Sequence, residues 1–106
     1  MKTGADYIEE FSSYCDTPVG KKAKKFDEQN PKVWDLFLKY AREISLKGRK
    51  RYSITMLVER IRWHSLVETT DDTFKISNSY RAYYARKLMA HYDEFRGLFE
   101  TAEPRQ

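Results

Sequence analysis

The sequence predicts a mainly α-helical protein with a three-helix core, and three observations support this fold class. Apolar residues recur every three or four positions over 31–47, 53–66 and 78–92, as they do on the buried face of a helix. Residues that favour helix starts and stops stand at the ends of these segments. The connection between the first two segments is so short that their helices must pack as neighbours.

The segment 31–47 has the clearest helix pattern in the chain. Asn30 can cap this helix because its side chain accepts a backbone N–H, and Pro31 loses no donor at the first helical position. The apolar stripe consists of Trp34, Phe37, Leu38, Ala41 and Ile44. Gly48 predicts the end of the helix, since glycine adopts the left-handed conformation that terminates many helices.

Ser53 is predicted to cap the second helix with its hydroxyl group. The buried stripe of this helix consists of Ile54, Leu57, Val58 and Ile61. Met56 and Trp63 lie to one side of that stripe. The first two helices form either an antiparallel hairpin or a steeper crossing, and we predict a helix-turn-helix-like pair.

The stretch "VETTDDTFKIS" predicts a short β-hairpin, or wing, between the second and third helices, with its two aspartates at the turn. Asn78 or Ser79 then caps the third helix, which runs to about Tyr92. The core-facing stripe of this helix includes Tyr80, Tyr84 and Leu88. Tyr83 falls beside the stripe, where its ring can reach the surface.

A chain of 106 residues can bury one modest core, so we expect a single helical domain at 26–101. Residues 1–25 are predicted to form a short helix followed by a lysine-rich linker, "DTPVGKKAKK". The apolar residues of that short helix are Tyr7, Ile8, Phe11 and Tyr14. A docking turn ends the domain before a frayed tail at 102–106. The docking residues are Phe95, Leu98 and Phe99.

Charge and composition restrict the kinds of partner and the cellular compartment that we expect for this protein. The formal net charge of +4 favours anionic partners weakly. Cys15 is the only cysteine, so no intramolecular disulfide can form, and we expect a reducing compartment such as the cytoplasm. No apolar run approaches the roughly 20 residues that cross a bilayer, so we expect no membrane partner.

No stretch of the chain has a catalytic signature, and we expect a protein that is not an enzyme and that uses no cofactor or metal. His64 and His91 lack the spacing of metal ligands. Asp71, Asp72 and Lys75 weakly resemble the acidic cluster of a metal-dependent nuclease. Adjacent aspartates on a turn more often satisfy the backbone of that turn, so the nuclease hypothesis ranks last.

A basic cluster between the first two helices is the strongest indication of function. The cluster comprises Lys47, Arg49, Lys50 and Arg51, with Tyr52 beside it. The N-terminus of the helix capped by Ser53 adds partial positive charge and N–H groups, which suits phosphate. A cation after a helix complements the helix dipole, and Lys47 fits that role. The further basic residues exceed this need, which favours an anionic ligand.

Three stretches resemble a family of small uncharacterised proteins of phages and prophage regions: "GRKRYSITMLVERIRW", "FKISNSYRAYYARKLM" and "GLFET". The resemblance covers about residues 26–101 and rests on the glycine-basic turn, the Arg-Trp pair and the tyrosine-rich third helix. It implies a phage accessory protein in the cytoplasm of a bacterial host, and it implies no established activity.

Two hypotheses of function follow. In the favoured one, the protein binds nucleic acid, preferably DNA, through the basic cluster with Tyr52. Arg60, Lys75 of the wing and Arg81 add contacts in this hypothesis. In the alternative, the protein binds and inhibits a host protein, as a monomer or a homodimer, through aromatic residues. Those residues are Trp63, Tyr83 and Phe99.

Overall fold

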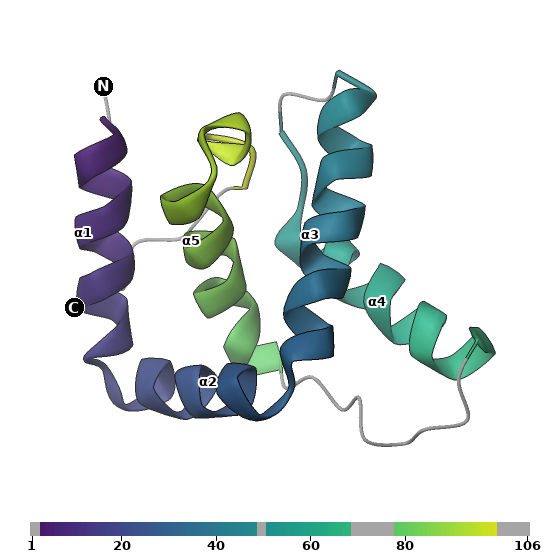
Figure 1. The fold of residues 1–106 in the computed structure, drawn as a ribbon, viewed down its shortest axis with the longest axis horizontal. Coiled ribbons are helices and arrows are strands. Elements are labelled where there is room, and N and C mark those ends of the chain that lie inside the picture. Colours follow the sequence, from purple (N-terminus) through teal and green to yellow (C-terminus); the bar gives the residue numbers. More distant parts are fainter. Residues whose placement is uncertain (1–2, 49–50, 69–77, 100–106) are drawn as a thin grey trace.

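The computed structural model describes the backbone of residues 3–48, 51–68 and 78–99, and side chains for most of them. The described residues fold into five α-helices and two short 3₁₀ turns that pack into an all-α globule (Figure 1). The elements are α1 (Gly4–Cys15), α2 (Pro18–Gln29), α3 (Pro31–Leu46), α4 (Ile54–Glu68), η1 (Asn78–Tyr80), α5 (Arg81–His91) and η2 (Asp93–Phe95).

Helix α1 confirms the predicted N-terminal helix. It begins with a capping box, in which the Thr3 hydroxyl accepts the Asp6 N–H and the Asp6 carboxylate accepts the Thr3 N–H. The helix lies alongside α5 (Figure 1), and its aromatic residues pack against the core from that side. None of its residues is fully buried, so α1 covers the core without entering it.

The prediction of a lysine-rich linker before residue 26 is wrong, because this stretch lies in helix α2. Thr17 caps the helix by accepting the Gly20 N–H at 3.0 Å, and Pro18 occupies its first turn. The four lysines are exposed, whereas Ala23 between them is completely buried. The lysines therefore form the solvent face of an amphipathic helix.

Helix α3 confirms the predicted helix over 31–47, ending at Leu46. Its start differs in one detail, because the Asn30 side chain makes no cap on α3. Asn30 Nδ2 instead donates to the Phe26 carbonyl oxygen at 2.9 Å and completes the end of α2. Gly48 follows α3 with a φ of +77°, in the left-handed region that favours glycine, as predicted.

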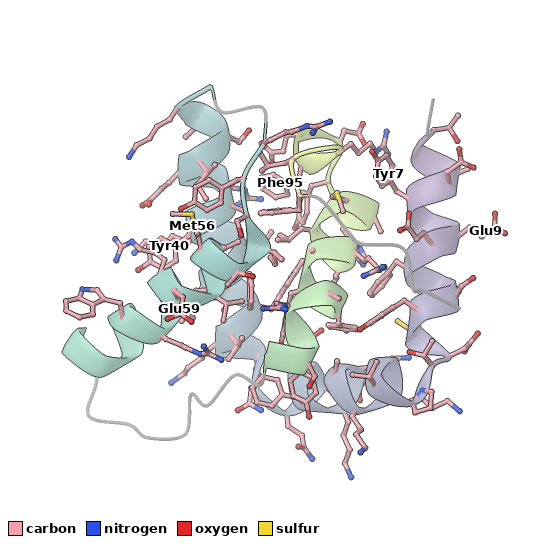
Figure 2. The ribbon with its side chains drawn as sticks, turned by 180° about the vertical axis from the view of Figure 1, so that it is seen from behind. Tyr7, Glu9, Tyr40, Met56, Glu59 and Phe95 are labelled. Atoms are coloured by element: carbon pink, nitrogen blue, oxygen red, sulfur yellow. The ribbon has the colours of Figure 1, made fainter. Side chains whose placement is uncertain are left out.

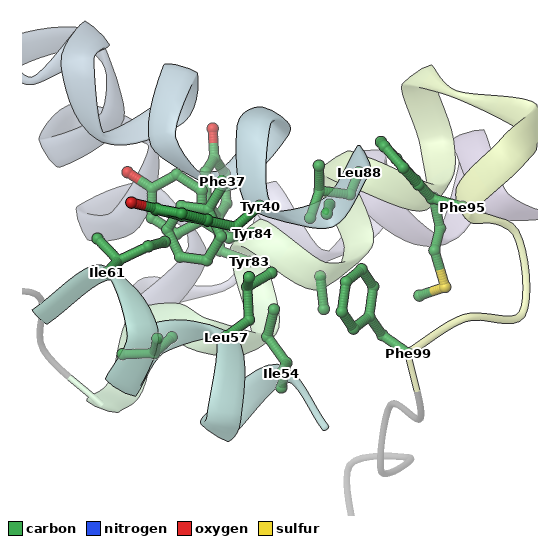
Figure 3. Packing of buried hydrophobic residues seen from close by; sticks show 14 of the residues in the cluster. Phe37, Tyr40, Ile54, Leu57, Ile61, Tyr83, Tyr84, Leu88, Phe95 and Phe99 are labelled. Atoms are coloured by element: carbon green, nitrogen blue, oxygen red, sulfur yellow. The ribbon is translucent and has the colours of Figure 1, made fainter. Parts of the chain in front are cut away.

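Helix α4 begins directly after Ser53, as predicted, and runs across α3 rather than along it (Figure 1). All four residues of its predicted stripe are buried, and Figure 3 shows Ile54, Leu57 and Ile61 turned toward the core. The helix extends to Glu68, into the first residues of the predicted wing. No strand occurs within 3–48, 51–68 and 78–99; the rest of the wing, 69–77, lies outside the described residues.

Helix α5 is the central element of the core. Most of its residues are buried: Tyr83, Tyr84, Ala85, Arg86, Leu88, Met89 and Ala90. The Tyr84 ring stacks on the Phe37 ring with centroids 4.2 Å apart and planes 10° apart (Figure 3). Leu88 is also fully buried, so the predicted stripe of the third helix is confirmed at these two positions.

The C-terminal docking turn is confirmed, because all three of its apolar residues are buried. The turn reaches back to the residue that precedes Ser53. The Tyr52 N–H donates to the Leu98 carbonyl oxygen at 2.7 Å, and Tyr52 and Phe99 form an isolated parallel bridge. Tyr52, which follows the basic turn, is therefore fixed by contacts with the docking turn.

Candidate functional site

The outward side of α4 exposes two large apolar side chains. Met56 is 58 % exposed and Trp63 is 60 % exposed. They are seven residues apart, which places them two turns apart on one side of the helix. Glu59 lies between them, and Figure 2 shows it projecting from α4 together with Met56. We call Met56, Glu59, Arg60 and Trp63 the α4 face.

Arg60 stands at the edge of the α4 face that borders α3. Its guanidinium carbon lies 4.6 Å from the centroid of the Tyr40 ring, and Figure 2 shows Tyr40 beside α4. Lys39 Nζ is 5.5 Å from the same centroid. This cation–π contact restricts the side chain of Arg60, which is nevertheless exposed, so its N–H groups can reach a ligand.

Arg81 stands at the opposite edge of the α4 face. Although it is the first residue of α5, its Nη1 donates to Thr55 Oγ1 of α4 at 3.2 Å. Thr55 and Arg60 are five residues apart, or about 140° around the helix axis and about 7.5 Å along it. The two predicted arginines therefore flank the apolar part of the α4 face, one on each side.

The acidic residue of the α4 face is neutralised within the helix. The Glu59 carboxylate and Arg62 Nη1 are 2.6 Å apart, an ion pair between residues three apart on the helix. Arg62 therefore adds little net charge to the surface. Arg60 and Arg81 supply the excess positive charge around Met56 and Trp63.

The basic turn is described in part. Lys47 caps the C-terminus of α3 and is exposed, as its predicted role at the helix dipole requires. Arg51 is also exposed, whereas Tyr52 is half-buried against the core. Three predicted contact residues lie outside the described residues. These are Arg49, Lys50 and Lys75.

The residues of the alternative protein interface separate in the structure. Trp63 is exposed, but Tyr83 is only 2 % exposed and Phe99 only 3 %. The expectation of a Tyr83 ring at the surface is wrong, because α1 covers this side of α5. The Phe11 and Tyr83 rings lie 5.4 Å apart. Trp63 remains as the aromatic residue of this set that a partner can reach.

A second cluster of polar groups, which we did not predict from the sequence, lies between α1, α2 and α5. Asp27 is buried and accepts hydrogen bonds from the Tyr83 hydroxyl, at 2.8 Å, and from the Lys87 ammonium. Lys87 Nζ also lies 4.1 Å from the centroid of the Trp34 ring. Asp27 shares one helix face with Gly20 and Ala23, and that spacing was the signal that could have predicted its burial.

The cluster borders a cavity of about 680 Å³ that also exposes Cys15 and His91. Burial, and then the hydrogen bond to Asp27, raise the pKa of Tyr83. Burial also raises the pKa of the Cys15 thiol, which disfavours the nucleophilic thiolate. Because Asp27 already binds two donors, we interpret the cluster as a connection between α2 and α5 rather than a reactive site.

Other site chemistries find no support in the part of the chain that the structure describes. No three acidic, histidine or cysteine side chains gather there in a way that could hold a metal ion. Among the described helices, none combines the length and apolar character needed to span a membrane.

Comparisons with known proteins find no match for this chain. It fits no protein-family model, and neither a curated protein nor a solved structure is detectably similar to it. The α4 face and the basic turn are therefore the basis for a proposal of function.

Proposed function

We propose that the protein is a non-enzymatic nucleic-acid-binding protein that contacts phosphates with the edges of the α4 face and with the basic turn. The observation that carries this proposal is the placement of Arg60 and Arg81 on opposite edges of α4. Each guanidinium is already positioned by a neighbouring side chain, Tyr40 or Thr55. Positioning before binding lowers the entropy that binding costs.

In this proposal α3 and α4 act as a helix-turn-helix-like pair, and α4 is the helix presented to the nucleic acid. Lys47 and Arg51 are exposed and belong to the basic turn that precedes α4 in the chain. Arg49 and Lys50 belong to the same basic turn in the sequence, and we expect them to add to its charge.

The salt dependence of binding tests the proposal. If Lys47, Arg51, Arg60 and Arg81 each neutralise one phosphate, log K against log salt should have a slope on the order of −3 to −4 on duplex DNA. Fluorescence anisotropy with a labelled oligonucleotide measures this slope. Replacing Arg60 and Arg81 with alanine should reduce its magnitude by about 0.9 per arginine.

Arg42→Ala is the matched control, because it also removes one arginine charge, but from α3 and not from the edges of the α4 face. Arg42 is exposed and lies 3.7 Å from Glu94, near the C-terminal turn. We expect its binding slope to equal that of the wild type. A flat salt dependence of the wild type, or an equal loss in the Arg42→Ala variant, would contradict the proposal.

A protein partner is the second candidate function, and the exposure of Met56 and Trp63 favours it. Exposed aromatic residues, methionine and arginine are typical of the centres of protein interfaces. In this case a partner, or a second copy of the chain, should remain bound after nuclease treatment in high salt. Trp63→Ala should release it, and sedimentation of the purified protein distinguishes a homodimer from a complex.

A further inference from the structure

The centre of the α4 face is apolar, and contacts with phosphate alone leave it unused. Met56 and Trp63 remain exposed between the two flanking arginines. Burial of these two side chains by a ligand would be favourable. A nucleic acid covers an exposed indole most effectively with the face of an unpaired base.

The composition of α4 argues against reading base edges in the major groove. Base edges in DNA are recognised mostly by Arg, Lys, Asn and Gln, and the sequence of α4 contains no Lys, Asn or Gln. Of the two arginines of α4, Arg62 is already paired with Glu59.

We propose that the α4 face binds single-stranded nucleic acid, with a base stacked on the indole of Trp63 and the strand's phosphates held by Arg60 and Arg81. This inference rests on the proposed function and names its substrate class. The positive charge at both edges complements the backbone, and the aromatic ring between them receives a base. Met56, about 10 Å away along the helix, provides a second apolar contact for the same strand.

A comparison of strandedness tests the inference. Anisotropy should show tighter binding to a labelled single strand of mixed sequence than to its duplex at the same salt concentration. Trp63→Ala should weaken single-strand binding about tenfold and duplex binding much less, because only the single strand loses a stacked base while the arginines remain. Trp63→Phe should restore most of the single-strand affinity, since phenylalanine also has a ring face.

Ile8→Ala provides the matched control, because Ile8 is an equally exposed apolar residue, 55 % exposed, on α1. It should bind both nucleic acids as the wild type does. Tryptophan fluorescence adds a direct readout. Binding of a single strand should quench the wild type but not Trp63→Phe, whose remaining indole, Trp34, is packed against Tyr84.

The failures of the two proposals are distinguishable. The stacking inference is overturned if the duplex binds as tightly as the single strand. It is also overturned if Trp63→Ala binds the single strand normally while Arg60→Ala weakens binding. In both cases the proposed function stands. If neither nucleic acid binds, both are overturned. In that case Trp63-dependent retention of a nuclease-resistant partner would assign the α4 face to a protein.

Discussion

Charged residues have different environments on the two sides of this protein. Between α1, α2 and α5, Asp27 is buried and paired with Lys87. Arg86 there is only 6 % exposed and lies with its guanidinium carbon 4.5 Å from the Tyr14 ring centroid. On α4 the flanking Arg60 is exposed to solvent.

The difference predicts where a substitution will have its effect. Removing one partner of a buried ion pair leaves the other charge uncompensated, which lowers the free energy of unfolding strongly. An exposed charge contributes little to stability because water screens it, and it is accessible to a ligand. Substitutions near Asp27 should therefore change stability, and substitutions on the α4 face should change binding.

The largest effect is expected for Asp27→Ala. It leaves the Lys87 ammonium and the Tyr83 hydroxyl without their acceptor and should lower the free energy of unfolding by about 3–5 kcal/mol. The matched control is Glu59→Ala, which removes an exposed pair with Arg62 and should cost less than about 1 kcal/mol. Urea unfolding followed by circular dichroism measures both, and equal losses would refute the contrast.

Gly20→Ala should have the next largest effect. A Cβ at this position would lie 1.9 Å from the Tyr14 carbonyl oxygen, so the corner between α1 and α2 must open, at a cost of about 3 kcal/mol. Gly48→Ala meets no atom within 4 Å and should cost only about 1 kcal/mol, for its positive φ. Opening of this corner should also let Cys15 react faster with a thiol reagent in Gly20→Ala than in the wild type. In Gly48→Ala the rate should be unchanged.

A smaller, pH-dependent effect is expected at His91, at the border of the Asp27 cluster. Burial, and then the Lys87 ammonium, lower its pKa, while Asp27 opposes the shift. Below pH 6.5 the unfolded state therefore binds a proton more readily than the folded state, so stability declines as pH falls through the lowered pKa. As the pH is lowered below 6.5, the urea midpoint of unfolding should decrease more for the wild type than for His91→Gln. Identical decreases would contradict this assignment.

The smallest effect on stability is expected for Trp63→Ala. Its exposed ring contributes little to the core, and the free energy of unfolding should change by no more than about 0.5 kcal/mol. Trp34→Ala is the contrasting substitution, because the Trp34 ring packs against Tyr84 and contacts the Lys87 ammonium. Thermal unfolding should show a clear loss of stability for Trp34→Ala only. Comparable losses would mean that the α4 face belongs to the core.

Local patterns in the sequence predicted much of the helical core. The stripe beginning at Ile54 and the buried Tyr84 follow from helical spacing, and Gly48 follows from the conformation that ends a helix. The exposure of Met56 and Trp63 also follows from their offset to that stripe. These features depend on neighbours within a few turns of the same helix, which a sequence displays directly.

Features that depend on distant neighbours could not be predicted in this way. The lysines of α2 resembled a linker by composition. The burial of Ala23 and Asp27 on one face of α2 depends on the packing of that face against α5. The burial of Tyr83 depends on α1, far away in the sequence. The placement of Arg81 beside Thr55 likewise depends on how α5 meets α4.

The hydrogen bond from the Tyr52 N–H to the Leu98 carbonyl oxygen affects the order in which the protein can fold during synthesis. A polypeptide leaves the ribosome from its N-terminus, so the basic turn and α4 emerge long before Leu98 does. Tyr52 can therefore make this hydrogen bond only after synthesis has reached the docking turn. Until then, the apolar stripe of α4 lacks the cover of Phe99, and we expect chains shortened before Leu98 to bind neither nucleic acid nor protein in the native manner.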